Sequence, residues 1–410
     1  MKNLKALFGG DIRQLGMLIA LFALTILFQW WTGGKVLTST NMMNLLNGNS
    51  YILVLAIGMV LVIIAGHIDL SVGSIAAFVG IVVAIAMRDW GIPWYLAIVL
   101  GLVLGALAGA WQGFWVAYVG IPAFIVTLSG MMFFRGANQW VGKSNTVPVP
   151  AEFQYIGAGY LPELPVPINA NFLTLVLGAV LIAAVVWMEF RSRKQHQLLG
   201  SEVSPLWVVI VRLGFLGAII AYMTYLFAFG RPGTSFPISG LILMVLVLIY
   251  SFVANKTILG RHIYAVGGNK LAAELSGVKT KRVNFFVMMN MSVLAALAGM
   301  IFVARSTASG PFDGVGWELD AIAAVFIGGA AVSGGVGTVV GSMIGGLVMA
   351  VLNNGLQLLS VGSDWTQMIK GLVLLIAVAF DVYNKMQGKP SITGLIAKGF
   401  GLGKKKSAAS

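Results

Sequence analysis

Long apolar runs separated by short polar intervals follow one another along most of this chain. Each run holds roughly 17 to 25 residues, and at about 1.5 Å per residue a helix of that length crosses the roughly 30 Å of bilayer hydrocarbon. Backbone groups in lipid must be paired within their own segment, and the runs are too long and too uniformly apolar for the strands of a barrel. The pattern therefore predicts an all-α bundle of membrane helices.

The apolar runs predict about twelve transmembrane segments, within a range of 10–12. The twelve candidates are residues 14–31, 45–65, 71–87, 94–118, 123–141, 172–190, 206–229, 236–254, 284–304, 319–333, 338–354 and 365–383. We assign residues 1–388 to one transmembrane domain. Residues 389–410 form a basic tail that we expect to be disordered or attracted to anionic lipid.

The composition agrees with a polytopic membrane protein. Hydrophobic residues make up 59% of the chain and charged residues 10%, with a mean hydropathy of +0.93, whereas soluble domains are about one quarter charged. The chain has no cysteine, which excludes a disulfide framework, thiolate chemistry and a cysteine zinc cluster. We expect this chain to be embedded in the lipid bilayer.

The net charge of +13 would suit nucleic acid, but its placement favours a membrane topology instead. Eighteen of the 26 Lys and Arg residues lie before the first run, at residues 191–194, at 255–283 and after residue 383. If these four segments are cytoplasmic, an even number of spans separates each from the next, as the positive-inside rule requires. We therefore expect both termini and the loop 255–283 in the cytoplasm, the loop 142–171 outside, and no nucleic acid partner.

The centre of the interval 255–283 reads as a short helix. Asn269 is suited to be its N-cap and Gly277 its C-terminal stop. Leu271, Leu275 and Val278 recur at i, i+4 and i+7, so this helix has one apolar face. A helix this short falls below the roughly 12 to 15 residues that persist alone in water, so something must pack against it. The cover is either the end of its own bundle, the lipid interface, or a second protein.

The apolar pattern breaks at residues 66–74, where His67, Asp69, Ser71 and Ser74 occur. Ionisable groups at membrane depth are costly and normally face a bundle interior or water, so the break is typical of a broken helix pair that lines a path. The alternative is a tight turn at the membrane surface, with Asp69 capping the helix that begins at Ser71. No second His or carboxylate stands at ligand spacing, which argues against a metal site.

A second break runs from Glu318 to Gly346. Glu318 and Asp320 precede a short apolar run, which is followed by six glycines at positions 334, 335, 337, 341, 345 and 346. Small residues at these spacings allow membrane helices to pack closely. Short glycine-interrupted segments also occur as discontinuous helices beside a transport path. A faint similarity to residues 69–80 raises an inverted repeat as a hypothesis.

Four stretches together resemble the membrane permease subunit of bacterial ABC importers for simple sugars, the ribose/xylose type that is related to branched-chain amino acid permeases. They are Gly-His-Ile-Asp-Leu-Ser-Val-Gly-Ser at 66–74, Ile-Pro-Ala-Phe-Ile-Val-Thr-Leu-Ser-Gly at 121–130, the segment from Gly260 to Val278, and Glu-Leu-Asp-Ala-Ile-Ala-Ala at 318–324 with Asn354-Gly355-Leu356. The resemblance covers residues 51–140 and 255–383. The additional hairpin at 172–229 looks like that of the xylose and multiple-monosaccharide members.

The resemblance implies a homodimeric permease of the inner membrane that is not an enzyme and moves a monosaccharide, such as the pentose xylose, inward. It implies two further partners: a cytoplasmic ATPase subunit, which binds ATP and Mg, and a periplasmic sugar-binding protein. The implied coupling residues are Gly267, Gly268, Asn269, Ala272, Glu274, Leu275, Ser276 and Gly277, and the candidates for the substrate path are His67, Asp69, Ser71, Ser74, Glu318, Asp320 and Asn354. The chain departs from the family at His67, where many members carry Gly or an acidic residue.

Three other functions are compatible with parts of this sequence. A proton-coupled secondary sugar carrier would use Asp69, His67 or Glu318 as its relay, but membrane-embedded acids are few and form no continuous chain. An ABC permease for another solute, such as a branched-chain amino acid or a nucleoside, keeps the same mechanism. A passive channel or a scaffold would leave the short helix at 269–277 without a purpose.

Overall fold

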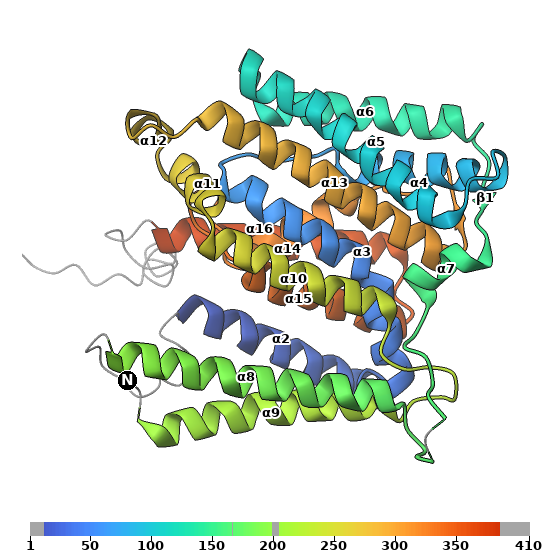
Figure 1. Cartoon of the computed structure of the whole chain (residues 1–410), viewed down its shortest axis with the longest axis vertical. Coiled ribbons are helices and arrows are strands. Elements are labelled where there is room, and N and C mark those ends of the chain that lie inside the picture. The colour runs from blue at the N-terminus through green and yellow to red at the C-terminus, as the bar shows by residue number, and fades with distance from the viewer. Residues whose placement is uncertain (1–11, 166, 199–204, 386–410) are drawn as a thin grey trace, which may run out of the picture.

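The computed structural model describes residues 12–165, 167–198 and 205–385. The predicted tail at 389–410 lies outside this part of the chain. The described residues fold almost entirely into helices (Figure 1). The helices are α2 (Ile12–Trp31), α3 (Ser39–Ile64), α4 (Val72–Arg88), α5 (Trp94–Phe114) with a π-helical turn (Trp115–Val119), α6 (Ala123–Val141), α7 (Ala151–Ala158), α8 (Phe172–Leu198), α9 (Leu206–Ala228), α10 (Ile238–Lys256), α11 (Ile258–Gly268), α12 (Lys270–Leu275), α13 (Thr280–Ser306), α14 (Trp317–Ile327), α15 (Val339–Leu358) and α16 (Ser363–Lys385).

Each apolar run that the sequence analysis identified contains a helix, so the all-α membrane bundle is confirmed. Among the described residues, seven helices are long and apolar enough to cross a bilayer. They are α3, α5 with its π-helical turn, α8, α9, α10, α13 and α15. Two shorter apolar helices lie at residues 16–31, within α2, and at α4.

The predicted span at residues 319–333 is wrong as a continuous helix. Its helix, α14, has 11 residues and ends at Ile327, which gives a length of only about 16 Å. The chain then follows an irregular path to α15, with left-handed backbone at Gly329, Gly334 and Gly335. Only glycine adopts that conformation without strain. The apolar composition continues past Ile327, but the helical backbone ends there.

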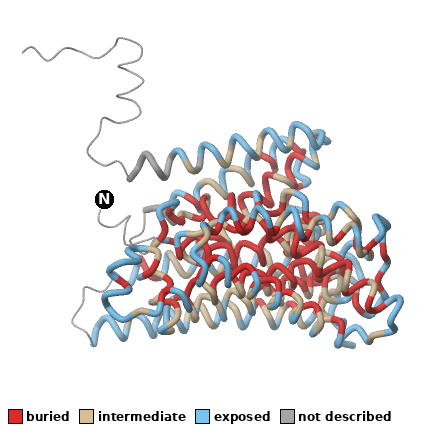
Figure 2. The backbone as a smooth tube through the Cα atoms, turned by 90° about the horizontal axis from the view of Figure 1, so that it is seen from above, coloured by how far each residue is buried: buried red, intermediate tan, exposed pale blue. Residues whose placement is uncertain are grey.

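Three helices form the centre of the bundle. In the most apolar window of each helix, 83% of the residues are buried in α3, 67% in α13 and 72% in α15, against 11% in α8 and in α9. Figure 2 shows the buried residues gathered in the middle of the molecule, with exposed residues around them. The hairpin of α8 and α9 is therefore peripheral, and its apolar surface is suited to face lipid.

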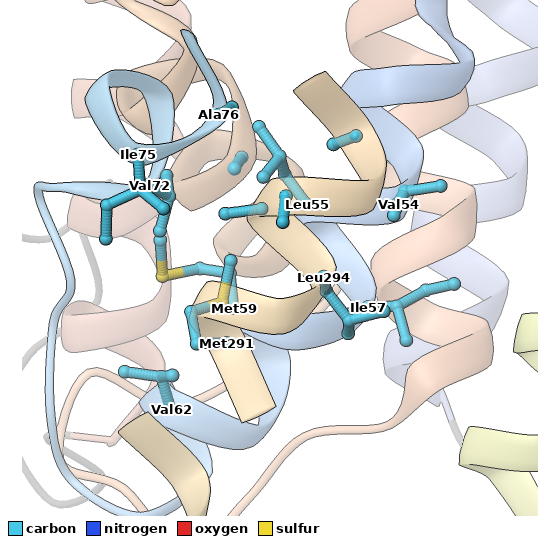
Figure 3. Close-up of a cluster of buried hydrophobic side chains, with 14 of the residues drawn as sticks. Val54, Leu55, Ile57, Met59, Val62, Val72, Ile75, Ala76, Met291 and Leu294 are labelled. Carbon is cyan, nitrogen blue, oxygen red and sulfur yellow. The ribbon is translucent and has the colours of Figure 1, made fainter. Parts of the chain in front are cut away.

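Side chains from α3, α4 and α13 interlock at this centre. Leu55 and Met59 of α3, Ile75 of α4 and Met291 and Leu294 of α13 are all buried in one apolar cluster (Figure 3). The helix that precedes residues 66–74 and the helix that follows them are thus fixed to the same long helix, α13. The break between them is held on both sides by a close-packed core.

Helices α5 and α13 approach each other through small residues. A methyl group built on Gly105 would lie 2.6 Å from the Cβ of Ala296, and one built on Gly109 would lie 2.6 Å from the Cα of Met289. Both distances are far below van der Waals contact, so only glycine fits at these two positions. The close approach brings Gln112, on the last turn of α5, to the start of α4.

The described part of the loop 142–171 contains a strand and a helix. Its strand β1 (Val147–Pro148) pairs antiparallel with β2 (Ala308–Ser309), which follows α13. Helix α7 places Phe153 in the core with no exposed surface and packs on α13. This loop and α12 lie at opposite ends of the bundle (Figure 1).

Candidate functional site

Helix α12 begins and ends where the sequence predicted. The Oδ1 atom of Asn269 accepts a hydrogen bond from the Ala272 N–H at 3.0 Å, as an N-cap does. The helix stops at Leu275, and Gly277 follows in the left-handed region with φ of +85°. The Thr280 hydroxyl donates to Glu274 Oε1 at 2.6 Å, which ties α12 to the first turn of α13. The sequence missed α11, the helix that directly precedes Asn269.

Two leucines of α12 have no cover within the described chain. Leu271 is 67% exposed and Leu275 is 83% exposed, whereas the side chain that packs inward is Ala273. The predicted apolar face is therefore only partly correct, because Val278 lies beyond the helix and is half-buried. Of the three covers considered, packing against the chain's own bundle is excluded for these two leucines.

Five glycines bring three separated segments into backbone contact. We name Gly66, Gly267, Gly268, Gly334 and Gly335 the glycine junction. The Gly335 N–H donates to the carbonyl oxygen of Ile64 at 2.8 Å. A methyl group built on Gly267 would lie 2.8 Å from the Gly335 nitrogen and still closer to that carbonyl oxygen, and one built on Gly335 would lie 2.8 Å from the Gly268 Cα.

The glycine junction connects α12 to both breaks in the apolar pattern. Gly267 and Gly268 end α11, one residue before the N-cap of α12. Gly66 opens the segment that leads to Asp69, and Gly334 and Gly335 belong to the path between α14 and α15. The Tyr264 hydroxyl, on α11, adds a hydrogen bond to the Gly337 carbonyl at 2.6 Å. Three segments that are far apart in sequence thus share one contact.

Asp69 is fully buried and organises the start of α4. Its Oδ1 atom accepts hydrogen bonds from the Ser71 N–H at 2.8 Å and from the Ser71 hydroxyl at 2.6 Å. The Gln112 amide of α5 donates to the same hydroxyl at 2.9 Å. Helix α4 begins at Val72 with Ser71 as its N-cap, so Asp69 orders the turn before the helix and does not itself cap it. Its second oxygen, Oδ2, has no hydrogen-bond partner in the described chain.

His67 and Ser74 flank this turn. The side chain of His67 is half-buried and interacts with Asn284 of α13, but its Nε2 atom has no partner among the described residues. Ser74, in the first turn of α4, is buried, and its hydroxyl also has no partner there. The 66–74 segment therefore carries three buried polar atoms that no described residue satisfies.

Glu318 lies against the same helix start. A methyl group built on Gly73 would lie 2.8 Å from Glu318 Oε2, which has no hydrogen-bond partner in the described chain. The other oxygen, Oε1, lies 3.9 Å from Arg135 Nη2 of α6. The structure thus brings together Glu318 from one break and the Asp69 turn from the other.

Asp320 and Asn354 lie apart from that group. Lys370 of α16 donates to Asp320 Oδ2 at 3.0 Å, and both residues line a pocket of about 280 Å³ between α14, α15 and α16. Asn354 of α15 exchanges two hydrogen bonds with Asn41 of α3, at 2.8 and 2.9 Å. The paired amides satisfy each other, so Asn354 ties two central helices together.

Comparison with known proteins places the chain in a family. Residues 41–378 match the family described as the branched-chain amino acid transport system permease component. The chain belongs to this family. It is therefore a multi-pass membrane permease, and no solved structure matches it.

Three relatives align with this permease over nearly its whole length. The xylose transport system permease protein XylH of Haemophilus influenzae is 41% identical over 371 residues, covering 90% of this chain and 96% of the relative. XylH of Escherichia coli is 40% identical over 370 residues, covering 90% and 91%. The ribose import permease protein RbsC of Bacillus subtilis is 34% identical over 377 residues, covering 91% and 94%.

Three residues of the permease's polar interior were missed by sequence reasoning. Gln112 supports the Asp69 turn, Arg135 faces Glu318, and Lys370 pairs with Asp320. Each is a polar or charged residue inside an apolar run, and this signal alone marks a position that faces the bundle interior. Their partners could not be read from the sequence, because every pair joins two different segments of the chain.

Proposed function

We propose that this permease is the membrane subunit of an ATP-driven importer that carries a monosaccharide, xylose, across the inner membrane. The observation that carries this proposal is the identity of 40 to 41% with two xylose transport permeases over 90% of the chain. The permease itself has no enzymatic role in this scheme. ATP and Mg are bound, and ATP is hydrolysed, on a separate cytoplasmic subunit.

The ATPase subunit docks on α12. Leu271 and Leu275 are large apolar side chains exposed on a six-residue helix. Burial of such apolar surface by a partner stabilises the complex. Gly267, Gly268, Asn269, Ala272, Glu274, Ser276 and Gly277 complete the docking segment and its caps.

A displacement of α12 reaches the bundle through the glycine junction. ATP binding closes the ATPase pair and moves α12, and Gly267 then presses on Ile64 and Gly335 because no side chains cushion the contact. The end of α3 leads directly into the Asp69 turn. The permease needs only a difference in contacts between two states for ATP binding to shift their populations.

The substrate path passes the Asp69 turn. His67, Asp69, Ser74 and Glu318 each offer a polar atom that lacks a partner within the described chain, and sugar hydroxyls supply both donors and acceptors. Ser71 and Gln112 position Asp69 and are not themselves free to bind. Asp320 lines a separate pocket between α14, α15 and α16, whereas Asn354 joins α15 to α3 through Asn41.

The proposed membrane topology assigns one side of the membrane to each end of the bundle. It has twelve segments, with α14 as a short one, both termini and α12 in the cytoplasm, and the loop 142–171 in the periplasm, where the sugar-binding protein delivers its sugar. The basic end of α8, with Arg191 and Lys194, lies at the same end of the molecule as α12, which supports this orientation (Figure 1). Two copies form the working dimer. An inverted repeat stays a hypothesis, and a superposition of the two halves without a common helix arrangement would reject it.

Uptake of labelled xylose tests the proposal directly. Cells with and without this chain are compared after ATP depletion and, separately, after collapse of the proton gradient at constant ATP. We expect chain-dependent uptake to fail only when ATP is depleted. Failure on gradient collapse would instead identify a proton-coupled carrier and make His67 and Asp69 the next residues to mutate. Competition by an amino acid or a nucleoside, but by no sugar, would reassign the substrate.

A further inference from the structure

A pocket of about 440 Å³ opens beside α12, between α11 and the start of α13. Three of its side chains are apolar and three are basic or titratable. The apolar ones are Leu259, Val283 and Phe286, and the others are His262, Lys279 and Arg282. Gly277 also lines the pocket, but neither the proposed transport activity nor the docking of α12 uses any of these six side chains.

The charge of this pocket is not balanced by the described chain. No acidic residue lines it, and neither Lys279 nor Arg282 forms an ion pair with another described residue. The one acidic side chain in the interval 255–283 is Glu274, whose carboxylate accepts from the Thr280 hydroxyl. Arginine and lysine together are well suited to bind a phosphate group.

The pocket is also graded from polar to apolar along α13. Lys279 immediately precedes α13, Val283 is in its first turn, and Phe286 lies about 10 Å along the axis from Lys279. Helix α13 is one of the helices that are long and apolar enough to cross the bilayer. A ligand that fills this pocket therefore needs an anionic group at one end and an apolar body at the other.

We propose that this pocket binds an anionic phospholipid, with its phosphate at Lys279 and Arg282 and an acyl chain on Leu259, Val283 and Phe286. Basic pockets between helices at the membrane surface bind such head groups. A protein partner with an acidic segment would match the charges but would leave the three apolar side chains of the pocket uncovered. The bound lipid would join α11 to α13 next to the segment that carries α12.

Lipid retention by the purified full-length chain tests this proposal independently of transport. The protein is reconstituted in nanodiscs with equal amounts of phosphatidylglycerol and phosphatidylcholine, and the retained lipids are counted by native mass spectrometry. The variant is K279Q/R282Q. Its matched control is K256Q/K281Q, which removes the same charge at two exposed residues of the same interval that do not line the pocket.

We expect the pocket variant to lower the affinity for phosphatidylglycerol about 30-fold, from about a fivefold loss for each basic residue at the membrane surface. The control should retain the lipid as the parent chain does, and the charge-preserving variant K279R/R282K should restore most of the binding. Equal retention by the pocket variant and the control would overturn the proposal. It would also be overturned if the pocket variant kept its lipid but no longer bound the purified ATPase subunit, since the pocket would then serve a protein partner.

Discussion

Substitution of Gly267 by alanine tests how closely the three segments of the glycine junction are packed. The added methyl group would lie 2.8 Å from the Gly335 nitrogen and still closer to the Ile64 carbonyl oxygen. Overpacking of this kind costs about 1 to 3 kcal/mol. If the two segments separate enough to break the 2.8 Å hydrogen bond between Gly335 and Ile64, about 1 kcal/mol more is lost.

The helix propensity of alanine opposes this loss, so the sign of the change in stability shows which effect is larger. Gly267 lies in the last turn of α11, where alanine is favoured over glycine by up to about 1 kcal/mol. We therefore expect a net destabilisation of about 2 kcal/mol for G267A. The neighbouring G268A is a matched control, because a methyl group on Gly268 meets nothing within 4 Å.

Thermal unfolding of the purified permease and xylose uptake in cells are the two assays for this pair. We expect G267A to unfold at a lower temperature than G268A and to transport less sugar at equal membrane abundance, while G268A is at least as stable as the parent because the helix preference for alanine acts there unopposed. If G267A is as stable and as active as G268A, the three segments are not in firm contact. The junction would then play no part in transmitting movement.

Three further changes probe the docking helix, the Asp69 turn and a loop at the other end of the bundle. L275E places a charge on the exposed face of α12, and we expect it to abolish uptake while immunoblots show normal membrane insertion. D69A removes the acceptor of two Ser71 hydrogen bonds, and we expect unfolding assays to show a loss of about 1 to 3 kcal/mol, with D69N less affected because its amide oxygen still accepts. Burial raises the pKa of Asp313, and a hydrogen bond from the Gly310 N–H partly offsets this rise. The folded protein therefore holds this proton more tightly than the unfolded chain, so its stability falls as pH rises from about 4. D313N keeps the acceptor, and its unfolding temperature should fall less between pH 4 and 8 than that of the parent.

Each of these predictions has a result that contradicts it. Normal uptake by the L275E variant would show that the ATPase does not dock through this face. Equal losses for D69A and D69N would mean that the charge of Asp69, and not its acceptor geometry, holds the start of α4. Identical pH profiles for D313N and the parent would mean that Asp313 does not titrate in this range.

Features that depend on neighbouring residues were predictable from the sequence. The ends of α12 follow from Asn269 and Gly277, because a cap and a stop act within a few residues of the helix they bound. The same holds for Asp69, whose acceptor reaches Ser71 two positions away. The membrane class followed from composition and from run length alone.

Features that depend on tertiary contact were not predictable. The apolar composition of residues 319–333 hid the end of α14 at Ile327, since hydropathy does not report backbone conformation. The glycines at 267 and 335 were visible, but nothing in the sequence indicates that both approach the carbonyl of Ile64. The partners of Arg135 and Lys370 are hidden for the same reason.

The glycine junction is made of main-chain atoms, and this has a consequence for how such permeases diverge. Its hydrogen bond from Gly335 to Ile64 uses only a main-chain amide and a main-chain carbonyl, and the close approach of the segments depends on their glycines. In the proposed function, by contrast, the transported sugar meets side chains that line the path. A substitution that alters what the permease accepts therefore leaves this connection untouched. The transported molecule and the coupling to ATP can therefore change separately within one fold.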